Sequence, residues 1–373
     1  MKLKIAALPG DGIGPEVTAQ AIKAMQAVAD TYGHTFEFNE APVGAVAIDK
    51  TGNPLPEETL SLCEQSDAVL FGAIGDPKYD NNPDAGVRPE QGLLRLRKAL
   101  GLFANIRPVK AYPTLLDKSP LKKHIIESTD MMIYRELTGG IYFGEKKQSE
   151  DGSVASDLCE YSEAEIERIT HLAFKAARSR RKKITLVDKA NVLESSRLWR
   201  KVVTAIGKSY DDVTLDFLFV DNAAMQLILN PRQFDVILTE NMFGDILSDE
   251  GSVIGGSIGL LASASIGTEN ALFEPIHGSF PQAKGKDIAN PIAAILSAAM
   301  LLEHFGLAEE GSTVKAAVES ALAQNAVTPD LNPESKLGTN CIGEYIANYI
   351  LNTDEEQVHI NHENVNFGRS TII

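Results

Sequence analysis

Short apolar runs alternate along the chain with longer amphipathic segments. The runs are mostly apolar on both faces, which is typical of strands in a sheet covered by helices. We predict strands at Lys4–Leu8, Asp67–Gly72, Met131–Tyr134, Ile184–Val187, Asp216–Val220 and Asp235–Thr239. Their alternation with helical segments predicts an α/β fold with a substantially parallel sheet.

The segments between these runs place apolar residues at helical spacing. The first such face is made by Val17, Ala21, Ala24, Val28 and Tyr32. Residues 166–176 repeat the pattern, and a further helix is expected to open at Asn290–Pro291 and to end near Phe305–Gly306. The stretch Leu137–Tyr161 is rich in glycine and polar residues, so we predict an arm or hairpin that leaves the core.

The composition is that of an ordinary globular protein. At about 100–200 residues per domain, the 373 residues suggest two domains. With 44% hydrophobic and 23% charged residues, the collagenous, disordered and disulfide-scaffold classes are excluded. No apolar run approaches the roughly 20 residues of a membrane span, and the first residues lack a signal-peptide core, so we expect a cytoplasmic protein. Cys63, Cys159 and Cys341 are expected to be reduced thiols.

Acidic residues outnumber basic ones by 51 to 35, which gives a net charge of −16. This balance argues against a nucleic-acid or anionic-membrane partner. The basic run at residues 178–183 closes a helical segment, and a favourable interaction with the helix carboxyl end explains it. If the substrate is an anion, cationic side chains must gather locally within an acidic protein.

A glycine-rich loop, Leu8–Glu16, follows the first strand and opens a helix. Its glycines are spaced G-x-G-x-G and not G-x-G-x-x-G, and Pro15 removes a backbone N–H that a pyrophosphate would use. We therefore predict a tight strand-to-helix turn and not a Rossmann site. The bare backbone still allows a ligand to come close.

Polar side chains follow four of the predicted strands. They are Arg135–Glu136, Asp188–Asn191, Asp221, and Asn241 with Asp245. Ligand sites in open α/β sheets form beyond the carboxyl ends of strands, so these segments are expected to converge.

Asp245 and Asp249 are four residues apart, which places both carboxylates on one face of a helix. Such a pair is more often a solvated helix face than a site. Here the neighbours Met242–Phe243 and Ile246–Leu247 are apolar and favour a buried pair. Two like charges require a counter-cation, and oxygen ligands favour Mg²⁺ or Mn²⁺.

The arginines provide the opposite charge. Arg97 and Arg107 are flanked by apolar residues, and Arg135 ends a strand. A guanidinium suits bidentate capture of a carboxylate, although each arginine taken alone is more often a structural or surface ion pair. Together with Lys189 and the aspartates, they suit a substrate with two carboxylates and a hydroxyl held on a metal.

Several long motifs resemble those of the β-decarboxylating dehydrogenases, most closely their 3-isopropylmalate branch. The motifs are Arg135–Gly144, Asp188–Leu193, Asn241–Asp249, Phe273–Ser279 and Ile288–Pro291. They occur in the family's order, and the resemblance extends from Leu8 to about Ile350.

The resemblance implies a two-domain fold of the isopropylmalate dehydrogenase type, with a large mixed, partly parallel sheet flanked by helices, and not a Rossmann fold. Residues 1–103 and 256–373 would form a discontinuous cofactor-binding domain. Residues 104–255 would form a dimerisation and substrate/metal domain, with an arm at about 138–161. A homodimer is implied, in which Lys189 and Asp221 of the partner subunit complete each active site.

The implied reaction is oxidative decarboxylation of 3-isopropylmalate to 4-methyl-2-oxopentanoate and CO₂, with reduction of NAD⁺, in leucine biosynthesis. Tyr142 and Lys189 would be catalytic, and Asp221, Asp245 and Asp249 would bind Mg²⁺ or Mn²⁺. The implied substrate-binding residues are Arg97, Arg107, Arg135, Asp221, Leu93, Leu94, Asn191 and Val192. The implied cofactor-binding residues are Ile13, Glu90, Glu274, His277, Gly278, Ser279, Gln282 and Asn290.

Other substrates of the same family, namely isocitrate, homoisocitrate, tartrate and D-malate, stay open as alternatives. Leu93–Leu94 favours an isopropyl group over a third carboxylate, and helical spacing places Arg95 nearer to solvent. Gln282 stands where NAD-dependent relatives usually have Asp, and Lys284 follows it, so we expect NAD⁺ with weakened discrimination against NADP⁺. A non-catalytic regulatory subunit would lack the catalytic Tyr, Lys or metal Asp, and all are present.

Overall fold

The computed structural model describes residues 1–82 and 86–352 and divides into two compact units. The first unit contains Met1–Leu100, Ser257–Ala264 and a segment that begins at Glu269, and the second contains Gly101–Gly256 and Ser265–Thr268. The tail after Asn352, for which the sequence suggested no role, lies outside the described residues. That one unit binds a cofactor and the other a partner and substrate stays a prediction.

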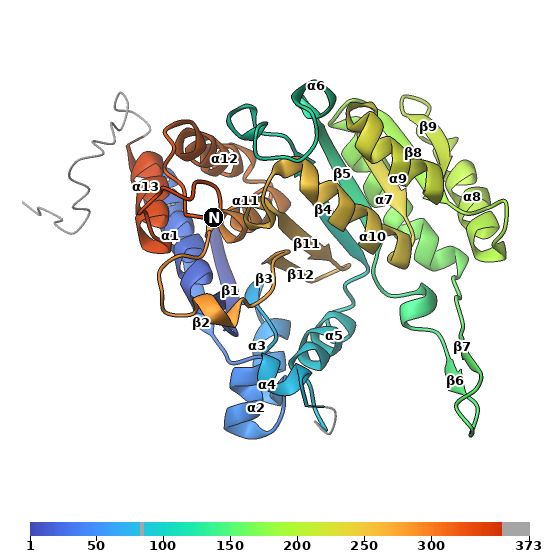
Figure 1. The fold of residues 1–373 in the computed structure, drawn as a ribbon, viewed down its shortest axis with the longest axis horizontal. Helices are drawn as coiled ribbons and strands as arrows, with labels where there is room; N and C mark the ends of the chain where they lie inside the picture. The colour runs from blue at the N-terminus through green and yellow to red at the C-terminus, as the bar shows by residue number, and fades with distance from the viewer. Residues whose placement is uncertain (83–85, 353–373) are drawn as a thin grey trace, which may run out of the picture. The chain divides into compact units, whose positions relative to one another are not determined.

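The first unit has five strands in the order β2, β1, β3, β12 and β11 (Figure 1). Its strands are β1 (Lys2–Gly10), β2 (Thr35–Glu40), β3 (Ala68–Ala73), β12 (Ala271–Pro275) and β11 (Ala262–Ile266), whose last two residues belong to the second unit. Its helices are α1 (Gly14–Tyr32), α2 (Ala45–Thr51), α3 (Glu57–Glu64), α4 (Pro77–Asp80), α5 (Pro89–Ala99), α11 (Ile292–His304), α12 (Ala308–Ala323) and α13 (Thr339–Leu351), with short 3₁₀ turns η5 (Ile258–Leu260) and η6 (Pro281–Ala283). The pairs β1–β2, β1–β3 and β3–β12 are parallel.

The second unit has its long strands in the order β4, β5, β10, β8 and β9. They are β4 (Ala104–Lys110), β5 (Asp130–Glu136), β8 (Lys183–Asp188), β9 (Thr214–Phe219) and β10 (Val236–Thr239). Its helices are α6 (Lys123–Ile126), α7 (Glu163–Arg178), α8 (Glu194–Gly207), α9 (Val220–Leu229) and α10 (Asn241–Ser252), with 3₁₀ turns η1 (Pro113–Leu115), η2 (Gly140–Tyr142), η3 (Pro231–Gln233) and η4 (Val253–Gly255). Only β4 runs antiparallel to its neighbour among these strands, so the mixed, largely parallel character is confirmed.

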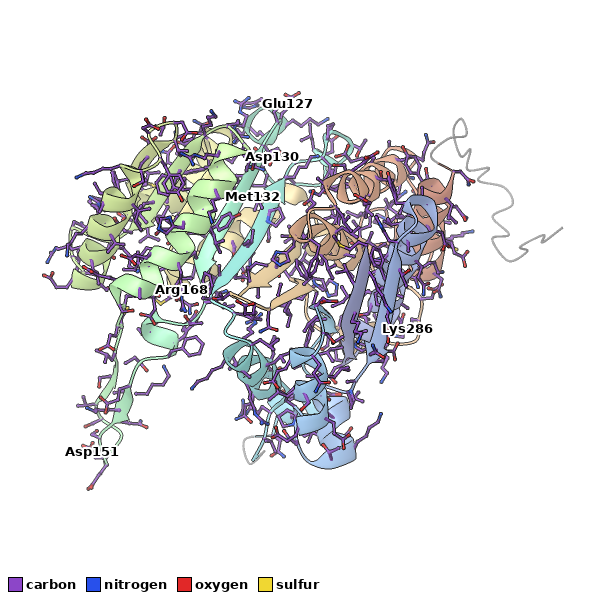
Figure 2. All side chains as sticks on the ribbon, turned by 180° about the vertical axis from the view of Figure 1, so that it is seen from behind. Glu127, Asp130, Met132, Asp151, Arg168 and Lys286 are labelled. Atoms are coloured by element: carbon purple, nitrogen blue, oxygen red, sulfur yellow. The ribbon has the colours of Figure 1, made fainter. Side chains whose placement is uncertain are left out.

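The expected arm is an antiparallel hairpin of β6 (Lys146–Gln148) and β7 (Ala155–Asp157), all of whose residues are exposed. Asp151 lies at its tip, and Arg168 of α7 lies beside its root (Figure 2). Arg168 donates a short hydrogen bond to the Thr138 hydroxyl, where the arm begins. The arm is therefore anchored at one end and open to solvent along its length.

All six predicted strands are present, but the expectation that helices cover both faces of the sheet is wrong for one strand. Residues 216–219 of the run at 216–220 belong to β9, which lies at the end of the strand order, and Asp216 and Phe217 are exposed. An edge strand has only one neighbour and less cover, so apolar residues alone do not bury it.

The glycine loop is the tight turn that its spacing predicted. Gly12 has φ +58°, and a Cβ there would lie 1.9 Å from the carbonyl oxygen of Ser279. The Ile13 amide donates to that same oxygen at 2.8 Å. The loop therefore uses its glycine to press against the segment around Ser279, an approach that no other residue allows.

The basic run after α7 is held by aspartates and not by the helix end alone. Arg180 pairs with Asp130 at 2.6 Å and with the buried Asp235 at 2.9 Å.

Cys63, Cys159 and Cys341 are all free thiols. No helix within residues 1–82 and 86–352 is long and apolar enough to cross a membrane.

Candidate active site

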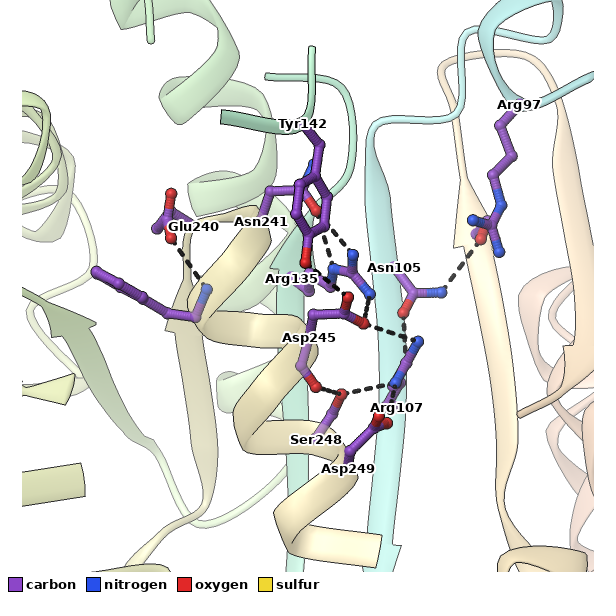
Figure 3. Close-up of polar contacts among 12 residues, drawn as sticks. Arg97, Asn105, Arg107, Arg135, Tyr142, Glu240, Asn241, Asp245, Ser248 and Asp249 are labelled. Carbon is purple, nitrogen blue, oxygen red and sulfur yellow. Dashed lines mark hydrogen bonds and ion pairs between the residues drawn. The ribbon is translucent and has the colours of Figure 1, made fainter. Parts of the chain in front are cut away.

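A buried arginine stands at the carboxyl end of β5. The Arg135 Nε and Nη2 atoms donate to the Oδ1 atom of Asn241 at 3.1 and 2.8 Å, and its Nη1 atom forms a short ion pair with Asp245 (Figure 3). A Cβ on Gly244 would lie 2.7 Å from the Cβ of Arg135. Glycine at this position therefore allows α10 to bring both of its polar residues onto the guanidinium.

A second arginine reaches the same helix from β4. The Arg107 Nη1 atom donates to the Ser248 hydroxyl at 2.7 Å and to Asp249 at 3.1 Å, and its Nη2 atom lies 3.8 Å from Asp245. The Asn105 Oδ1 atom accepts from the Arg107 Nε atom at 2.8 Å. The two guanidinium groups thus meet the two carboxylates of α10 (Figure 3).

Tyr142 approaches this cluster from η2. Its hydroxyl donates to the Oδ2 atom of Asp245 at 3.0 Å, and the Arg135 Cζ atom lies 5.9 Å from its ring centroid. Burial, followed by the negative charge of Asp245 and this hydrogen bond, raises the pKa of Tyr142. The phenol therefore keeps its proton at neutral pH and can act as an acid.

The expectation of a buried aspartate pair is wrong for Asp249. Its side chain is 70% exposed, whereas that of Asp245 is 34% exposed. Ile246, one of the apolar neighbours that suggested burial, is itself exposed. Consecutive residues of an α-helix point about 100° apart, so apolar sequence neighbours do not decide which face a carboxylate occupies.

Lys189 and Asp221 form a second, separate group. The Lys189 Nζ atom lies 2.5 Å from the Asp221 Oδ1 atom, and this hydrogen bond lowers the pKa of Asp221. Asn191 and Val192, which follow Lys189, are exposed. No group of three His, Cys, Asp or Glu side chains in the described part of the chain could hold a metal, so Asp221 does not join Asp245 and Asp249 within one chain.

The first unit pairs two of the expected residues with each other. The Arg97 Nη2 atom donates to Glu274 at 2.6 Å, and the Arg97 Nε atom is buried without a hydrogen-bond partner in the structure. Substrate binding was expected of Arg97 and cofactor binding of Glu274. Their contact means that any anion bound by Arg97 has to share or replace Glu274.

The other residues expected at the cofactor differ in access. The exposed ones are Glu90, Gly278 and Gln282, His277 is half-buried, and the buried ones are Ile13, Ser279 and Asn290. The Asn290 amide already donates to Asp330 and accepts from the Ile292 N–H. The His277 Nε2 atom is buried without a partner in the structure, and burial lowers the pKa of this imidazole. Near the expected substrate, Leu94 is exposed and Leu93 half-buried.

Sequence reasoning did not single out four residues of the second-unit cluster. They are Asn105, Tyr161, Glu240 and Ser248. Asn105 and Ser248 accept hydrogen bonds from Arg107, Tyr161 accepts one from the Asn241 backbone N–H, and Glu240 accepts from Tyr161 and from the Phe243 N–H. Ser248 lies three residues after Asp245 on the same helix face, which is a usable signal. Asn105 and Tyr161 are brought in by strand pairing and by the return of the arm, which short-range spacing does not show.

The chain matches the family model described as isocitrate/isopropylmalate dehydrogenase over residues 4–346. It is 54% identical to the 3-isopropylmalate dehydrogenase of Bacteroides fragilis (strain YCH46), over 94% of this chain and 99% of that protein. It is 52% identical to the 3-isopropylmalate dehydrogenase of Aquifex aeolicus (strain VF5), over 92% and 96%. The crystal structure of isocitrate dehydrogenase from Methylococcus capsulatus is similar with a TM-score of 0.83 at 35% identity, covering 94% of this chain and 99% of that chain.

Proposed function

Because the chain belongs to the isocitrate/isopropylmalate dehydrogenase family, we propose that it oxidises and decarboxylates 3-isopropylmalate to 4-methyl-2-oxopentanoate and CO₂, with NAD⁺ as hydride acceptor, in the leucine pathway of the cytoplasm. The observation that carries this proposal is the cluster of Arg107, Arg135, Tyr142 and Asp245. It combines two carboxylate-binding cations, a protonated phenol and a carboxylate in one place.

The arginines are proposed to bind the two carboxylates of the substrate. Arg107 and Arg135 now hold Asp245 and Asp249, so their guanidinium groups are already oriented toward negative charge. A bidentate guanidinium–carboxylate contact fixes both position and orientation. Arg97 is proposed to add a further contact to the substrate.

A divalent cation fits the oxygen donors of α10. Asp245 and Asp249 are one turn apart, and only hard oxygen ligands are present, as Mg²⁺ and Mn²⁺ prefer. One chain supplies two carboxylates, and Asp221 of the partner subunit is proposed as the third. When bound, the cation supplies a Lewis acid that lowers the pKa of an alcohol and stabilises negative charge on oxygen.

Lys189 and Tyr142 are proposed to move the protons. Lys189 of the partner subunit would accept or relay the proton of the C2 hydroxyl, and bound NAD⁺ would supply the hydride acceptor for oxidation at C2. After CO₂ is lost, Tyr142 donates a proton to the enol carbon. The raised pKa of Tyr142 suits this second role, because the phenol is protonated when the enol forms.

Exposed apolar side chains support a homodimer. Met225 and Leu229 on α9 and Ile246 on α10 are each more than half exposed. Asp221 lies on α9, and Asp245 and Asp249 lie on α10, so these exposed apolar residues lie on the same two helices as the proposed metal ligands. Burial of such a surface between two copies would bring Asp221 of one to α10 of the other.

Mixing two inactive variants tests the shared site. Lys189→Ala and Asp245→Asn each remove one half, so neither homodimer turns over. Dimers re-formed from an equal mixture would contain one intact site in each heterodimer and would recover about a quarter of the wild-type activity. No recovery in a mixture shown to exchange subunits would contradict a site shared between subunits.

Apolar side chains support the choice of substrate. Leu93, Leu94 and Val192 are proposed to receive the isopropyl group, and Leu94 and Val192 are exposed and available. Burial of three or four carbons contributes about 2–3 kcal/mol. NADH production with 3-isopropylmalate, isocitrate, homoisocitrate and tartrate, with and without Mg²⁺, tests the proposal. A higher kcat/KM for isocitrate would overturn the preference.

The cofactor proposal rests on Gln282 in η6. Glutamine can bind a ribose hydroxyl but does not repel a 2′-phosphate as a carboxylate would, and Lys284 lies nearby in sequence. We expect NAD⁺ to be preferred over NADP⁺ by a modest ratio. Gln282→Asp is expected to raise the ratio of the two kcat/KM values about tenfold, and a wild-type ratio in favour of NADP⁺ would contradict the proposal.

A further inference from the structure

Tyr161 lies where the arm returns to the second unit, and its hydroxyl has two partners. It donates to the Oε2 atom of Glu240 at 3.2 Å and accepts from the Asn241 backbone N–H at 3.0 Å. Its ring packs edge-on against Trp199 at 5.5 Å between centroids. The phenol therefore holds the first residues of α10 from a rigid, buried position.

The Tyr161 ring also fixes the start of the arm. A Cβ on Gly139 would lie 2.7 Å from the ring, and a Cβ on Gly140 would lie 2.2 Å from the hydroxyl oxygen. The Gly140 amide donates to the carbonyl of Glu160 at 3.0 Å. The two glycines lead directly into η2, which carries Tyr142, so the tyrosine that closes the arm is in contact with the turn that presents Tyr142.

Asn241 links Tyr161 to Arg135. It is buried, and its Oδ1 atom accepts two hydrogen bonds from Arg135, while its Nδ2 atom donates to the Gly139 carbonyl at 3.2 Å. Three parts of the cluster therefore converge on Tyr161. They are the guanidinium through Asn241, the acid Tyr142 through Gly139 and Gly140, and the first turn of α10 through Glu240.

On the basis of the proposed function, we propose that Tyr161 is a positioning residue of the active site. It touches neither substrate nor cofactor, and it aligns Arg135 with the first turn of α10 and with Tyr142. Its hydroxyl acts through Asn241, so its loss should disturb binding of the hydroxy acid and not binding of the dinucleotide.

Tyr161→Phe removes only the hydroxyl, and Tyr210→Phe is its matched control. Tyr210 is a buried tyrosine of the same core whose hydroxyl bonds to the His171 Nδ1 atom at 2.9 Å, with no contact to the Arg135 cluster in the described structure. We expect Tyr161→Phe to raise the KM for 3-isopropylmalate about tenfold, with the KM for NAD⁺ unchanged. Tyr210→Phe should lower the melting temperature to a similar extent and leave both KM values unchanged.

A double-mutant cycle separates positioning from a general loss of stability. If Tyr161 acts through Asn241, the variant with both Tyr161→Phe and Asn241→Ala has the same KM as Asn241→Ala alone. Equal KM values for Tyr161→Phe and Tyr210→Phe, or independent effects in the cycle, would overturn the inference while the wild type still turns over 3-isopropylmalate. Failure of the wild type to turn over would instead overturn the proposed function, and this inference with it.

Discussion

The second unit carries two charged groups that differ in how the chain holds them. The Arg135 side chain is 8% exposed and is fixed by Asn241, Asp245 and the approach of Gly244. Asp221 is 65% exposed, and its side chain accepts a hydrogen bond from Lys189. The first group is organised by the fold of one chain. The second is presented at the surface, where the proposed second copy of the chain would organise it.

Replacing Arg135 should give the largest effect, because it removes both binding and a buried partner. We expect Arg135→Ala to lower kcat/KM for 3-isopropylmalate about 1,000-fold. The free energy of unfolding should fall by about 3 kcal/mol, since breaking a buried pair leaves its other member uncompensated. Turnover and chemical denaturation measure the two effects.

Arg180→Ala is the control for this variant. Arg180 also binds a buried aspartate, Asp235. Asp235 precedes β10, whereas Asn241 follows the opposite end of that strand. Its loss should destabilise the protein with kcat/KM per folded molecule unchanged. An Arg135→Ala enzyme with the wild-type free energy of unfolding would show that the contacts of Arg135 do not stabilise the fold.

Replacing Lys189 should separate activity from stability. We expect Lys189→Ala to lower kcat about 100- to 1,000-fold, as loss of a general base or relay does. Its unfolding free energy should change by less than about 1 kcal/mol, because exposed ion pairs contribute little. Lys201→Ala is a suitable control, since Lys201 forms an exposed pair with Glu163 in the same unit at 2.9 Å. Near-wild-type kcat would remove Lys189 from the mechanism.

Tyr142→Phe should lower activity without lowering stability, unlike replacement of Arg135 in the same group. Tyr142 is exposed, and its hydroxyl contacts Asp245. We expect kcat to fall about 100-fold with no change in melting temperature. Because partial desolvation of the phenol and the nearby Asp245 raise the pKa of Tyr142, the wild-type kcat should show no loss from Tyr142 ionisation below its ordinary pKa of about 10. Release of the decarboxylated product at the wild-type rate would contradict the assignment.

The smallest effect is expected at Arg95, an exposed pair outside both groups. Arg95 bonds to the Leu55 carbonyl at 3.2 Å and to Glu57 at 2.5 Å, both in the first unit. Arg95→Ala should leave the preference for 3-isopropylmalate over homoisocitrate unchanged and alter stability by less than about 1 kcal/mol. A shift of that preference would mean that Arg95 enters the substrate site.

The sequence was sufficient for the strands with continuous apolar runs and for the helices with clear periodicity. It did not predict β4, because Asn105, Arg107 and Pro108 interrupt the apolar pattern of residues 104–110. That strand is the antiparallel one and carries Arg107 to α10. Periodicity misses a strand whose apolar pattern is interrupted by polar residues.

For the proposed site, the sequence analysis placed polar and charged residues at the ends of β5, β8, β9 and β10. These strands are neighbours and parallel, so their carboxyl ends share one edge. It did not show that Arg135 and Lys189 would belong to separate groups, since side-chain partners depend on which face of α9 or α10 each residue occupies. Asp249 is the clearest example. The motif Asn241–Asp249 is compatible with Asp249 on a buried or on an exposed face of α10, so the motif does not decide its exposure.

The division of the first unit has a consequence for synthesis of the chain. β3 pairs with β1 on one side, and its other side pairs with β12, which follows almost two hundred residues later. At about 5–20 residues per second, that edge stays unpaired on the ribosome for roughly 10–40 s. An open strand edge is a template for aggregation. Limited proteolysis of ribosome-bound chains should therefore find residues 101–256 protected first, with residues 1–100 dependent on chaperones until β12 emerges.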